Sequence, residues 1–478
     1  MFGLQYLLLI LTILLLISIL VRKSARIITL LTGIITILFV ILNNPTYTSF
    51  NYGSLSILYM SFRLVFIASV IIILIGIVEI FVSARFNARS GFYVFTQFLG
   101  MSLVILFTTN DFLLFYIAWE MVLIPTFFMI GIWGGPNKDY AAMKFFIYTH
   151  VGSVFMLLAI FTMYFQEGAT NFSMYYLMSN LNSIPLAYQS FVLFGFALAF
   201  LIKLPSVPLH TWLPDAYVEA PYEGTVIISS LLSKMGAFGL LFIFINLFQS
   251  SRYYGSTLIP WILVAFGIIS LIYSALVALY QKDMKRMMSY ASIGHMSFIT
   301  IATGGFLILG SGLYATLLYY GAVFQIISHG LIISLIFSTV GSVEKSTGTR
   351  NIVSMGGLAR KVPFLSFILL ASFLASVAIP GFSGFVGEIS VLIGSYGFLK
   401  IYFVFIMIGI VLTASYHIYT LQRTIFGPYN EYLGNIMENR NEILASLILL
   451  IPIIVLGIYP SLILHFFNIS QIGMGVFK

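Results

Sequence analysis

Long apolar segments separated by short polar ones recur along the whole sequence. A helix needs roughly 20 consecutive apolar residues to cross the hydrocarbon core of a bilayer. By that measure, the pattern predicts about 14 transmembrane helices. They are expected at residues 4–21, 26–42, 64–84, 91–108, 112–133, 143–165, 189–213, 223–248, 258–281, 285–305, 309–340, 362–397, 400–423 and 442–466. The pattern therefore predicts an all-α polytopic membrane protein.

The composition excludes a soluble globular domain. Hydrophobic residues make up 60% of the 478 positions and charged residues only 8%, about a third of the usual charged share of a soluble protein. Arg22 and Lys23 follow the first apolar segment instead of preceding it, which indicates a retained helix and not a signal peptide. No segment is long enough to fold separately, so residues 1–478 are expected to form a single membrane domain.

The distribution of positive charge predicts the orientation of the chain. Sixteen of the 22 Lys and Arg residues lie in loops after odd-numbered helices, and four lie on the opposite side. Because cytoplasmic loops collect Lys and Arg, both termini are expected outside. The net charge of +8 is spread thinly between apolar segments, so no basic face suited to nucleic acid is expected.

The chemistry of cofactors is expected to lie in other chains. The sequence has no Cys, which excludes disulfides, thiolate zinc sites and cysteine-ligated iron–sulfur clusters. Neither a Walker motif nor a strand-borne Gly-x-Gly-x-x-Gly is found. We therefore predict no cofactor and no metal in this chain, and any linked redox reaction must take place elsewhere.

Four charged residues lie near the middle of predicted helices and are the main candidates for function. Lys203 and Lys234 are the two remaining basic residues, and Glu120 and Glu388 stand at similar depth. A charge at mid-membrane costs about 2.5 to 3.5 kcal/mol on insertion scales, so a functional role is the default interpretation. The alternative for Glu120 is a static ion pair that fixes helix packing. Glu79 lies nearer a helix end and is expected to be interfacial or paired.

Two predicted helices are interrupted beside these charges. Pro205 and Pro208 follow Lys203, and Pro380 precedes Glu388 within a glycine-rich stretch. Prolines remove backbone donors, and broken helices at mid-membrane mark ion sites in transporters. The corresponding interruptions hint at two related repeats. A proline kink with a snorkelling Lys203 is the alternative at the first break.

His295 and His329 are the candidate relay residues between these charges. Each stands in a predicted helix beside small residues, as Lys234 does beside Ser233 and Gly236. Histidine exchanges protons near neutral pH, so the set suits proton transfer. The alternative for each histidine is a hydrogen-bonded packing residue.

Several long motifs resemble one known family. They are Trp119-Glu120, Lys203 through Asp215, Leu232 through Ala237, Lys282 through Arg286, Ser292 through Met296, and Gly384 through Glu388. From about residue 90 to 430 the chain resembles the antiporter-like membrane subunits of respiratory complex I, and most closely the M-type chain (NuoM). The acid at position 388 favours that type, since the L- and N-type chains and Mrp subunits look to carry Lys there.

The resemblance implies a fold of 14 helices with two inverted five-helix repeats, each containing a discontinuous helix. Three helices would occupy residues 1–90, the repeats residues 91–248 and 258–423, and a last helix residues 442–466. Proton-relay roles are implied for six residues. Glu120 and Lys203 would be the coupling pair, Lys234 the central base, His295 and His329 relay positions, and Glu388 the terminal proton carrier.

The function implied by the resemblance is proton translocation in an NADH:quinone oxidoreductase-like complex of a prokaryotic plasma membrane. Electron transfer in partner subunits would drive the proton translocation. The partner subunits would be L-, N-, H- and K-type membrane chains and a peripheral arm with iron–sulfur clusters, flavin and a quinone site. Two alternatives stay open. One is an Mrp-type Na⁺/H⁺ antiporter or membrane-bound hydrogenase subunit, and the other is a structural subunit that does not pump. The electron donor is not specified by this sequence.

Overall fold

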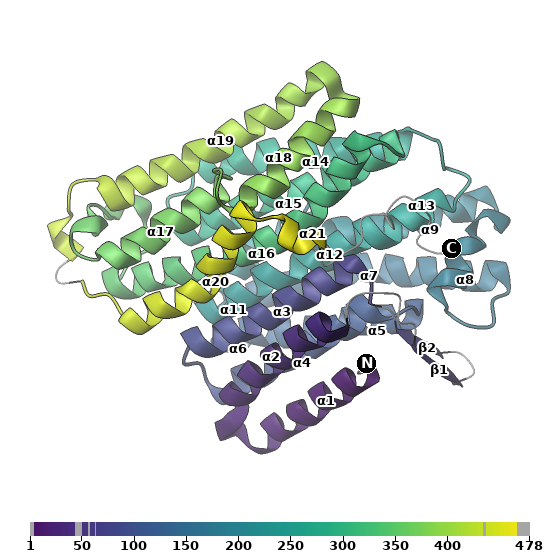
Figure 1. Ribbon diagram of the computed structural model, residues 1–478, viewed down its shortest axis with the longest axis horizontal. Helices are drawn as coiled ribbons and strands as arrows, with labels where there is room; N and C mark the ends of the chain where they lie inside the picture. The colour runs from purple at the N-terminus through teal and green to yellow at the C-terminus, as the bar shows by residue number, and fades with distance from the viewer. Residues whose placement is uncertain (1–3, 44–49, 56–57, 63, 434–435, 466–478) are drawn as a thin grey trace.

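The computed structural model describes residues 4–43, 50–55, 58–62, 64–433 and 436–465. Figure 1 shows the helices running broadly alongside one another, with α1 at the lower edge and α19 at the upper edge. The first group is α1 (Leu4–Leu20), α2 (Ala25–Asn43) and α3 (Phe66–Arg85). A short antiparallel hairpin, β1 (Phe50–Leu55) and β2 (Leu58–Phe62), stands between α2 and α3. The sequence pattern did not predict this hairpin.

The next helices carry the first candidate residues. They are α4 (Ser90–Thr108), α5 (Phe112–Met121), α6 (Leu123–Trp133), α7 (Lys138–Glu167), α8 (Met174–Ser179), α9 (Leu186–Lys203), α10 (Trp212–Glu219), α11 (Tyr222–Ile227), α12 (Ser233–Phe238) and α13 (Ile245–Gln249). Two π-helical segments, η3 (Ile228–Leu232) and η4 (Gly239–Phe244), join α11, α12 and α13. One continuous helix over 223–248 was expected, and π segments inside helices are frequent at functional sites.

The last helices carry the remaining candidates. They are α14 (Leu258–Leu279), α15 (Met284–Leu309), α16 (Leu313–Thr347), α17 (Pro363–Ser376), α18 (Ser383–Leu399), α19 (Val404–Leu421), α20 (Arg440–Ile458) and α21 (Ser461–His465). The π-helical η8 (Gln422–Phe426) prolongs α19. Helix α16, with 35 residues, is buried along its apolar stretch. It packs against α3, α15, α17, α18 and α20.

The predicted membrane segments agree with these helices. In the described part of the chain, 12 helical segments are long and apolar enough to cross a membrane, and α1 and α17 are shorter apolar helices. One of the 12 contains both α18 and α19, which turn at Lys400, where φ is 49°. With α17 and α18 counted as halves of one broken helix, each of the 14 predicted segments coincides with a helix or a set of consecutive helical pieces.

Both helix interruptions occur where the prolines predicted them. Helix α9 ends at Lys203, and the indole Nε1 of Trp212 donates to the Ile202 carbonyl across the break at 3.0 Å. Helix α17 ends at Ser376, and the chain turns through Gly381, where φ is 101°, before α18 begins. Only glycine adopts that backbone conformation without strain. The two discontinuous helices are thus confirmed.

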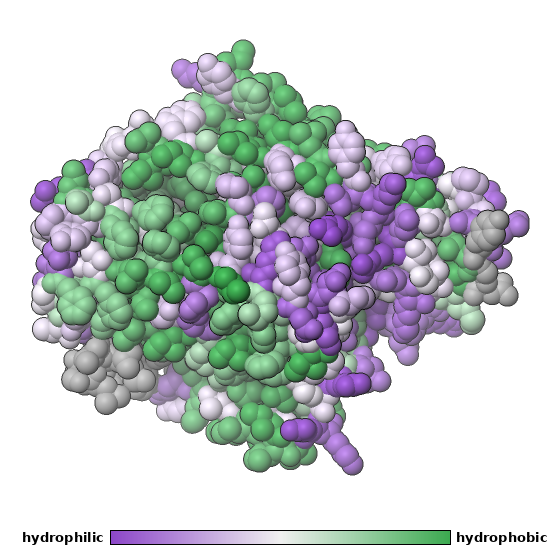
Figure 2. All heavy atoms as spheres, turned by 180° about the vertical axis from the view of Figure 1, so that it is seen from behind, coloured by the Kyte–Doolittle hydropathy of each residue, from purple (hydrophilic) through white to green (hydrophobic). Residues whose placement is uncertain are grey.

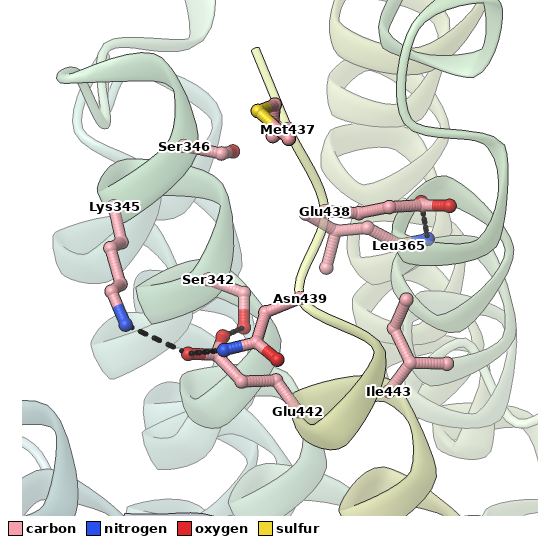
Figure 3. A pocket seen from close by; sticks show the side chains of 9 residues that line it. All are labelled: Ser342, Lys345, Ser346, Leu365, Met437, Glu438, Asn439, Glu442 and Ile443. Carbon is pink, nitrogen blue, oxygen red and sulfur yellow. Dashed lines mark hydrogen bonds and ion pairs between the residues drawn. The ribbon is translucent and has the colours of Figure 1, made fainter.

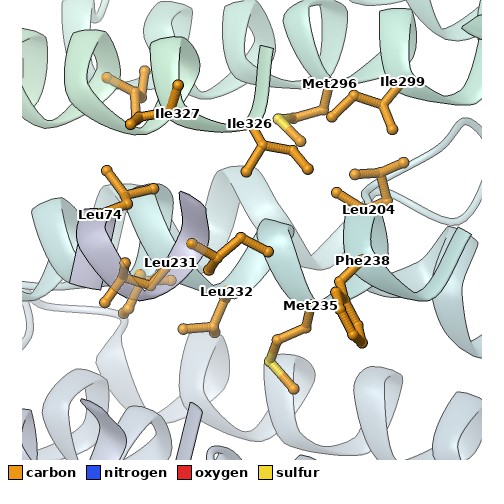
Figure 4. Packing of buried hydrophobic residues seen from close by; sticks show 14 of the residues in the cluster. Leu74, Leu204, Leu231, Leu232, Met235, Phe238, Met296, Ile299, Ile326 and Ile327 are labelled. Carbon is orange, nitrogen blue, oxygen red and sulfur yellow. The ribbon is translucent and has the colours of Figure 1, made fainter. Parts of the chain in front are cut away.

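The outer surface and the interior are both largely apolar. Figure 2 shows hydrophobic side chains over most of one face, with hydrophilic residues gathered mainly towards one end. Large hydrophobic side chains such as Leu42 and Phe165 are exposed on helices, as expected of a surface whose solvent is lipid. Inside, Leu74, Leu231 and Ile326 pack together from α3, η3 and α16 (Figure 4). The candidate residues therefore lie within a medium that stabilises charges poorly.

Candidate proton-relay site

Glu120 pairs with a histidine that the sequence analysis did not single out. Glu120 lies on α5, and its Oε2 is 3.0 Å from Nδ1 of His150 on α7. The His150 ring stacks on Phe146 at 5.6 Å between ring centroids. The side chains of His150 and Glu120 are 43% and 23% exposed on this chain. His150 is the one histidine of its predicted helix. A titratable side chain inside an apolar helix was thus the sequence feature that could have pointed to His150.

Lys203 stands apart from this pair. Its side chain is buried at the end of α9, and Nζ has no hydrogen-bond partner within the described residues. Nζ lies 5.2 Å from the ring centroid of Phe145 and 5.9 Å from that of Trp119, the neighbour of Glu120. The second Glu120 oxygen, Oε1, is also buried without a partner there. Since the described ion pairs do not include Glu120 with Lys203, the expected coupling pair is not closed in this structure.

Lys234 and His329 form the centre of the site. Lys234 lies on α12 between the two π segments, and its Nζ is 2.7 Å from Nδ1 of His329 on α16. Nζ also donates to the Ser233 hydroxyl at 3.1 Å. Nε2 of His329 lies 3.0 Å from the Ser292 hydroxyl of α15. A lysine ammonium has only donors, so Nδ1 accepts and Nε2 carries the hydrogen that faces Ser292.

His295 and Glu388 continue the line towards the second break. Nδ1 of His295 on α15 is 2.7 Å from Oε1 of Glu388 on α18. Nε2 of His295 is 2.9 Å from the hydroxyl of Ser376, the last residue of α17. Gln325 donates to the same carboxylate oxygen at 3.4 Å. The ring centroids of His295 and His329 are 6.1 Å apart, so the two hydrogen-bonded groups lie side by side.

The six predicted residues therefore fall into two groups. Lys234 with His329 and His295 with Glu388 are two buried, hydrogen-bonded pairs that lie next to each other and form a line of titratable side chains. Glu120 and Lys203 form the other group, which lies around α5 and the end of α9. A buried polar line of this kind costs desolvation energy, which its hydrogen bonds offset only in part. The line of four side chains can transfer protons, because each side chain can gain or lose a proton on a nitrogen or an oxygen.

Three other charged residues make hydrogen bonds or ion pairs outside the titratable line; Glu79 and Lys285 are buried and Glu442 is half-buried. Glu79 is 3% exposed, and Thr32 donates to its Oε2 at 2.9 Å. Glu79 was expected to be interfacial or paired; in the structure its partner is the hydroxyl of Thr32, and the ion pairs of the described residues do not include it. Lys285 is buried at the start of α15 and donates to the Ala220 carbonyl just beyond α10 at 2.6 Å. Glu442 joins Arg85 and Lys345 at 2.7 and 3.0 Å.

The Glu442 group lines a pocket that ties α16 to the start of α20. Figure 3 shows Glu442 reaching Ser342 and Lys345 of α16, while Glu438 accepts a hydrogen bond from the backbone of Leu365 at 3.2 Å. This pocket lies outside the titratable line. Across the described ranges, no group of three or more His, Cys, Asp or Glu side chains is placed to hold a metal ion.

The fold and the site together define an integral, multi-pass membrane protein with two broken helices and a buried line of titratable side chains. Residues 109–413 match the family described as "NADH:quinone oxidoreductase/Mrp antiporter, TM". The chain belongs to this family. The resemblance to M-type subunits seen in the sequence motifs is confirmed by the relatives below.

Two curated relatives carry M-type names. The chain is 37% identical over 384 residues to "F(420)H(2) dehydrogenase subunit M" of Methanosarcina mazei, covering 79% of this chain and 75% of that protein. It is 38% identical over 368 residues to "NADH-quinone oxidoreductase subunit M" of Rickettsia felis, covering 76% and 71%.

Solved structures share the fold. A chain of respiratory complex I from Thermus thermophilus superposes with a TM-score of 0.84 at 24% identity, over 95% of this chain and 97% of that one. A chain of the Mrp complex from Dietzia superposes with a TM-score of 0.83 at 20% identity, over 98% and 52%. The predicted fold class, a polytopic all-α membrane protein of the antiporter-like type, is therefore confirmed.

Proposed function

We propose that this chain is a proton-translocating membrane subunit of a complex I-like oxidoreductase. Protons would pass between Glu120, Lys203, Lys234, His329, His295 and Glu388, driven by electron transfer in partner subunits. The observation that carries the proposal is the buried contact of Lys234 with His329 beside that of His295 with Glu388. Four titratable side chains are costly to bury inside the membrane, and ionisable residues in such positions mark ion and proton pathways.

In this proposal, Glu120 and Lys203, which are not paired in this structure, switch proton transfer on and off beside the helix break after α9. Lys203 has no hydrogen-bond partner among the described residues, and Glu120 is held by His150. Closing a pair to 4 Å changes the Coulomb energy by roughly 4 kcal/mol at an effective dielectric of 20. That energy corresponds to about a thousandfold change in proton affinity. Pairing and unpairing of Glu120 and Lys203 would thus be sufficient to push a proton towards Lys234.

The partners in this proposal are other membrane chains and a redox arm. The named relatives are subunits of an F420H2 dehydrogenase and of an NADH-quinone oxidoreductase. For this chain we propose L-, N-, H- and K-type membrane neighbours, with iron–sulfur clusters, flavin and a quinone site in partner subunits. We also propose a prokaryotic plasma-membrane location, and the excess of Lys and Arg in one set of loops supports an orientation with both termini outside.

The first test is to purify the protein from native membranes in mild detergent and identify its partners by mass spectrometry. Iron–sulfur and quinone-site subunits are expected, and the input module would name the electron donor. Recovery of small hydrophobic antiporter subunits without any redox partner would contradict a redox-driven pump.

One alternative has a specific observation in its favour. The matched family includes Mrp antiporters, and the Mrp complex of Dietzia shares the fold. A Na⁺/H⁺ antiporter, or a membrane-bound hydrogenase subunit, would use the same helices. Transport that depends on Na⁺ and needs no electron donor would favour the antiporter. A structural subunit without pumping predicts that neutral variants of the buried charges leave proton translocation unchanged.

A further inference from the structure

His417 is a fully buried histidine on α19 that the six relay residues do not include. Its side chain is 0% exposed, and Nδ1 lies 2.8 Å from the carbonyl oxygen of Thr413, one turn earlier. A carbonyl accepts only, so Nδ1 carries the hydrogen and donates it. In the neutral ring Nε2 is then an acceptor. Nε2 is buried and has no hydrogen-bond partner in the described part of the chain.

The unpartnered nitrogen belongs to a ring that lies next to the relay. The ring centroids of His417 and His295 are 6.2 Å apart, nearly the separation of His295 from His329. His295 is therefore flanked by a histidine on each side. The remaining ring neighbours of His417 are Phe373, at 5.3 Å and edge-on, and Tyr416, at 4.4 Å. Aromatic faces of this kind hold the imidazole in place without satisfying Nε2.

A buried acceptor without a donor destabilises the folded state, because the atom has lost its hydrogen bonds to water. Both nitrogens of His295 have a partner, Glu388 at Nδ1 and Ser376 at Nε2. His417 has a fixed tautomer and one open acceptor, which is the arrangement that receives a proton. Protonation at Nε2 leaves the Nδ1 bond to Thr413 intact, so the ring can take up and return a proton without turning.

We propose that His417 is a further proton-relay residue, which takes up a proton at Nε2 from the neighbouring His295 and returns it there. It stands beside the line from Lys234 to Glu388 and holds one proton while Glu388 releases another. The proposal rests on the proposed function. It adds a role for α19, the helix that follows the broken pair α17 and α18.

The test uses the complete complex in sealed membrane vesicles, driven by the donor that purification identifies. In His417→Asn, the amide Nδ2 replaces Nδ1–H and keeps the bond to the Thr413 carbonyl, while the Nε2 acceptor is lost. Thr420→Val is the matched control. Thr420 is equally buried on α19, and its hydroxyl donates to the Tyr416 carbonyl at 2.8 Å.

The expected result is loss of protons translocated per electron in His417→Asn, with donor oxidation and assembly retained, and parental pumping in Thr420→Val. If His417→Asn does not assemble, His417→Gln takes its place, since its amide also cannot hold the proton. Parental pumping by either assembled variant would overturn the proposal. Lys234→Ala is measured in parallel. Full pumping by Lys234→Ala would refute the proposed function. Loss of pumping in Lys234→Ala together with parental pumping in the His417 variant would refute only the role of His417.

Discussion

Replacing Glu388 with Gln tests the line of buried residues most directly. Gln has nearly the same shape and keeps an oxygen that can accept from Nδ1 of His295, now 2.7 Å from Glu388 Oε1. A hydrogen bond to a charged group contributes about 1.5 to 3 kcal/mol and a neutral one about 0.5 to 1.5. The difference, about 1 kcal/mol, is small enough for the variant to fold and assemble.

The effect on proton transfer should be much larger than the effect on folding. The amide of Gln cannot take up or release a proton, and replacing the carboxylate also removes its Coulomb attraction for a cationic neighbour, roughly 4 kcal/mol for charges 4 Å apart at an effective dielectric of 20. The proton-transfer step through position 388 is then lost. Glu388→Gln is therefore expected to assemble, to oxidise the electron donor and to lose proton translocation.

The assay follows acidification of sealed vesicles with a pH-sensitive dye while donor oxidation is recorded in the same sample. Ser395→Ala is a suitable control, because Ser395 is buried on the same helix and donates to the Val391 carbonyl at 2.7 Å. Parental acidification by assembled Glu388→Gln would refute the relay and favour a structural role for the carboxylate.

Three further predictions concern residues elsewhere in the bundle. Lys203→Ala should leave the complex assembled and abolish proton translocation in the same vesicle assay, because the switch beside Glu120 is lost; full pumping would contradict the switch. Gly76→Val should destabilise the α2–α3 contact by about 1 to 3 kcal/mol, since a Cβ there would lie 2.7 Å from the Gly33 carbonyl; an unchanged melting temperature in detergent would contradict this packing. Lys285→Met should cost about 1 to 3 kcal/mol by removing the hydrogen bonds that its ammonium donates to the Val218 and Ala220 carbonyls, measurable as faster proteolysis between α10 and α11.

The helices and both breaks could be predicted from sequence because each rests on local chemistry. Apolar length gives a membrane segment, and Pro205 or Pro380 interrupts a helix wherever it stands. Intramembrane charge identified four of the six relay candidates, and the proton chemistry of histidine identified the other two; the roles of all six stay predictions. The partners of those residues were harder to predict, because they depend on how each helix is rotated about its own axis.

His150 and His417 illustrate that limit. Each is a single histidine in an apolar helix, and nothing in its neighbouring residues distinguishes packing from proton transfer. The π segments η3 and η4 add a second difficulty, because a helical projection with 3.6 residues per turn loses register across them. The contact of Lys234 with His329, 95 positions later, follows from that altered register and from the packing of α16.

The length of α16 determines which parts of the site can move. At 1.5 Å per residue its 35 residues extend about 52 Å, well beyond the roughly 30 Å of hydrocarbon. Helices on several sides pack against it, so we expect His329 to keep its position in the membrane during transport. We expect rearrangements to occur instead at the two interrupted pairs, α9–α10 and α17–α18.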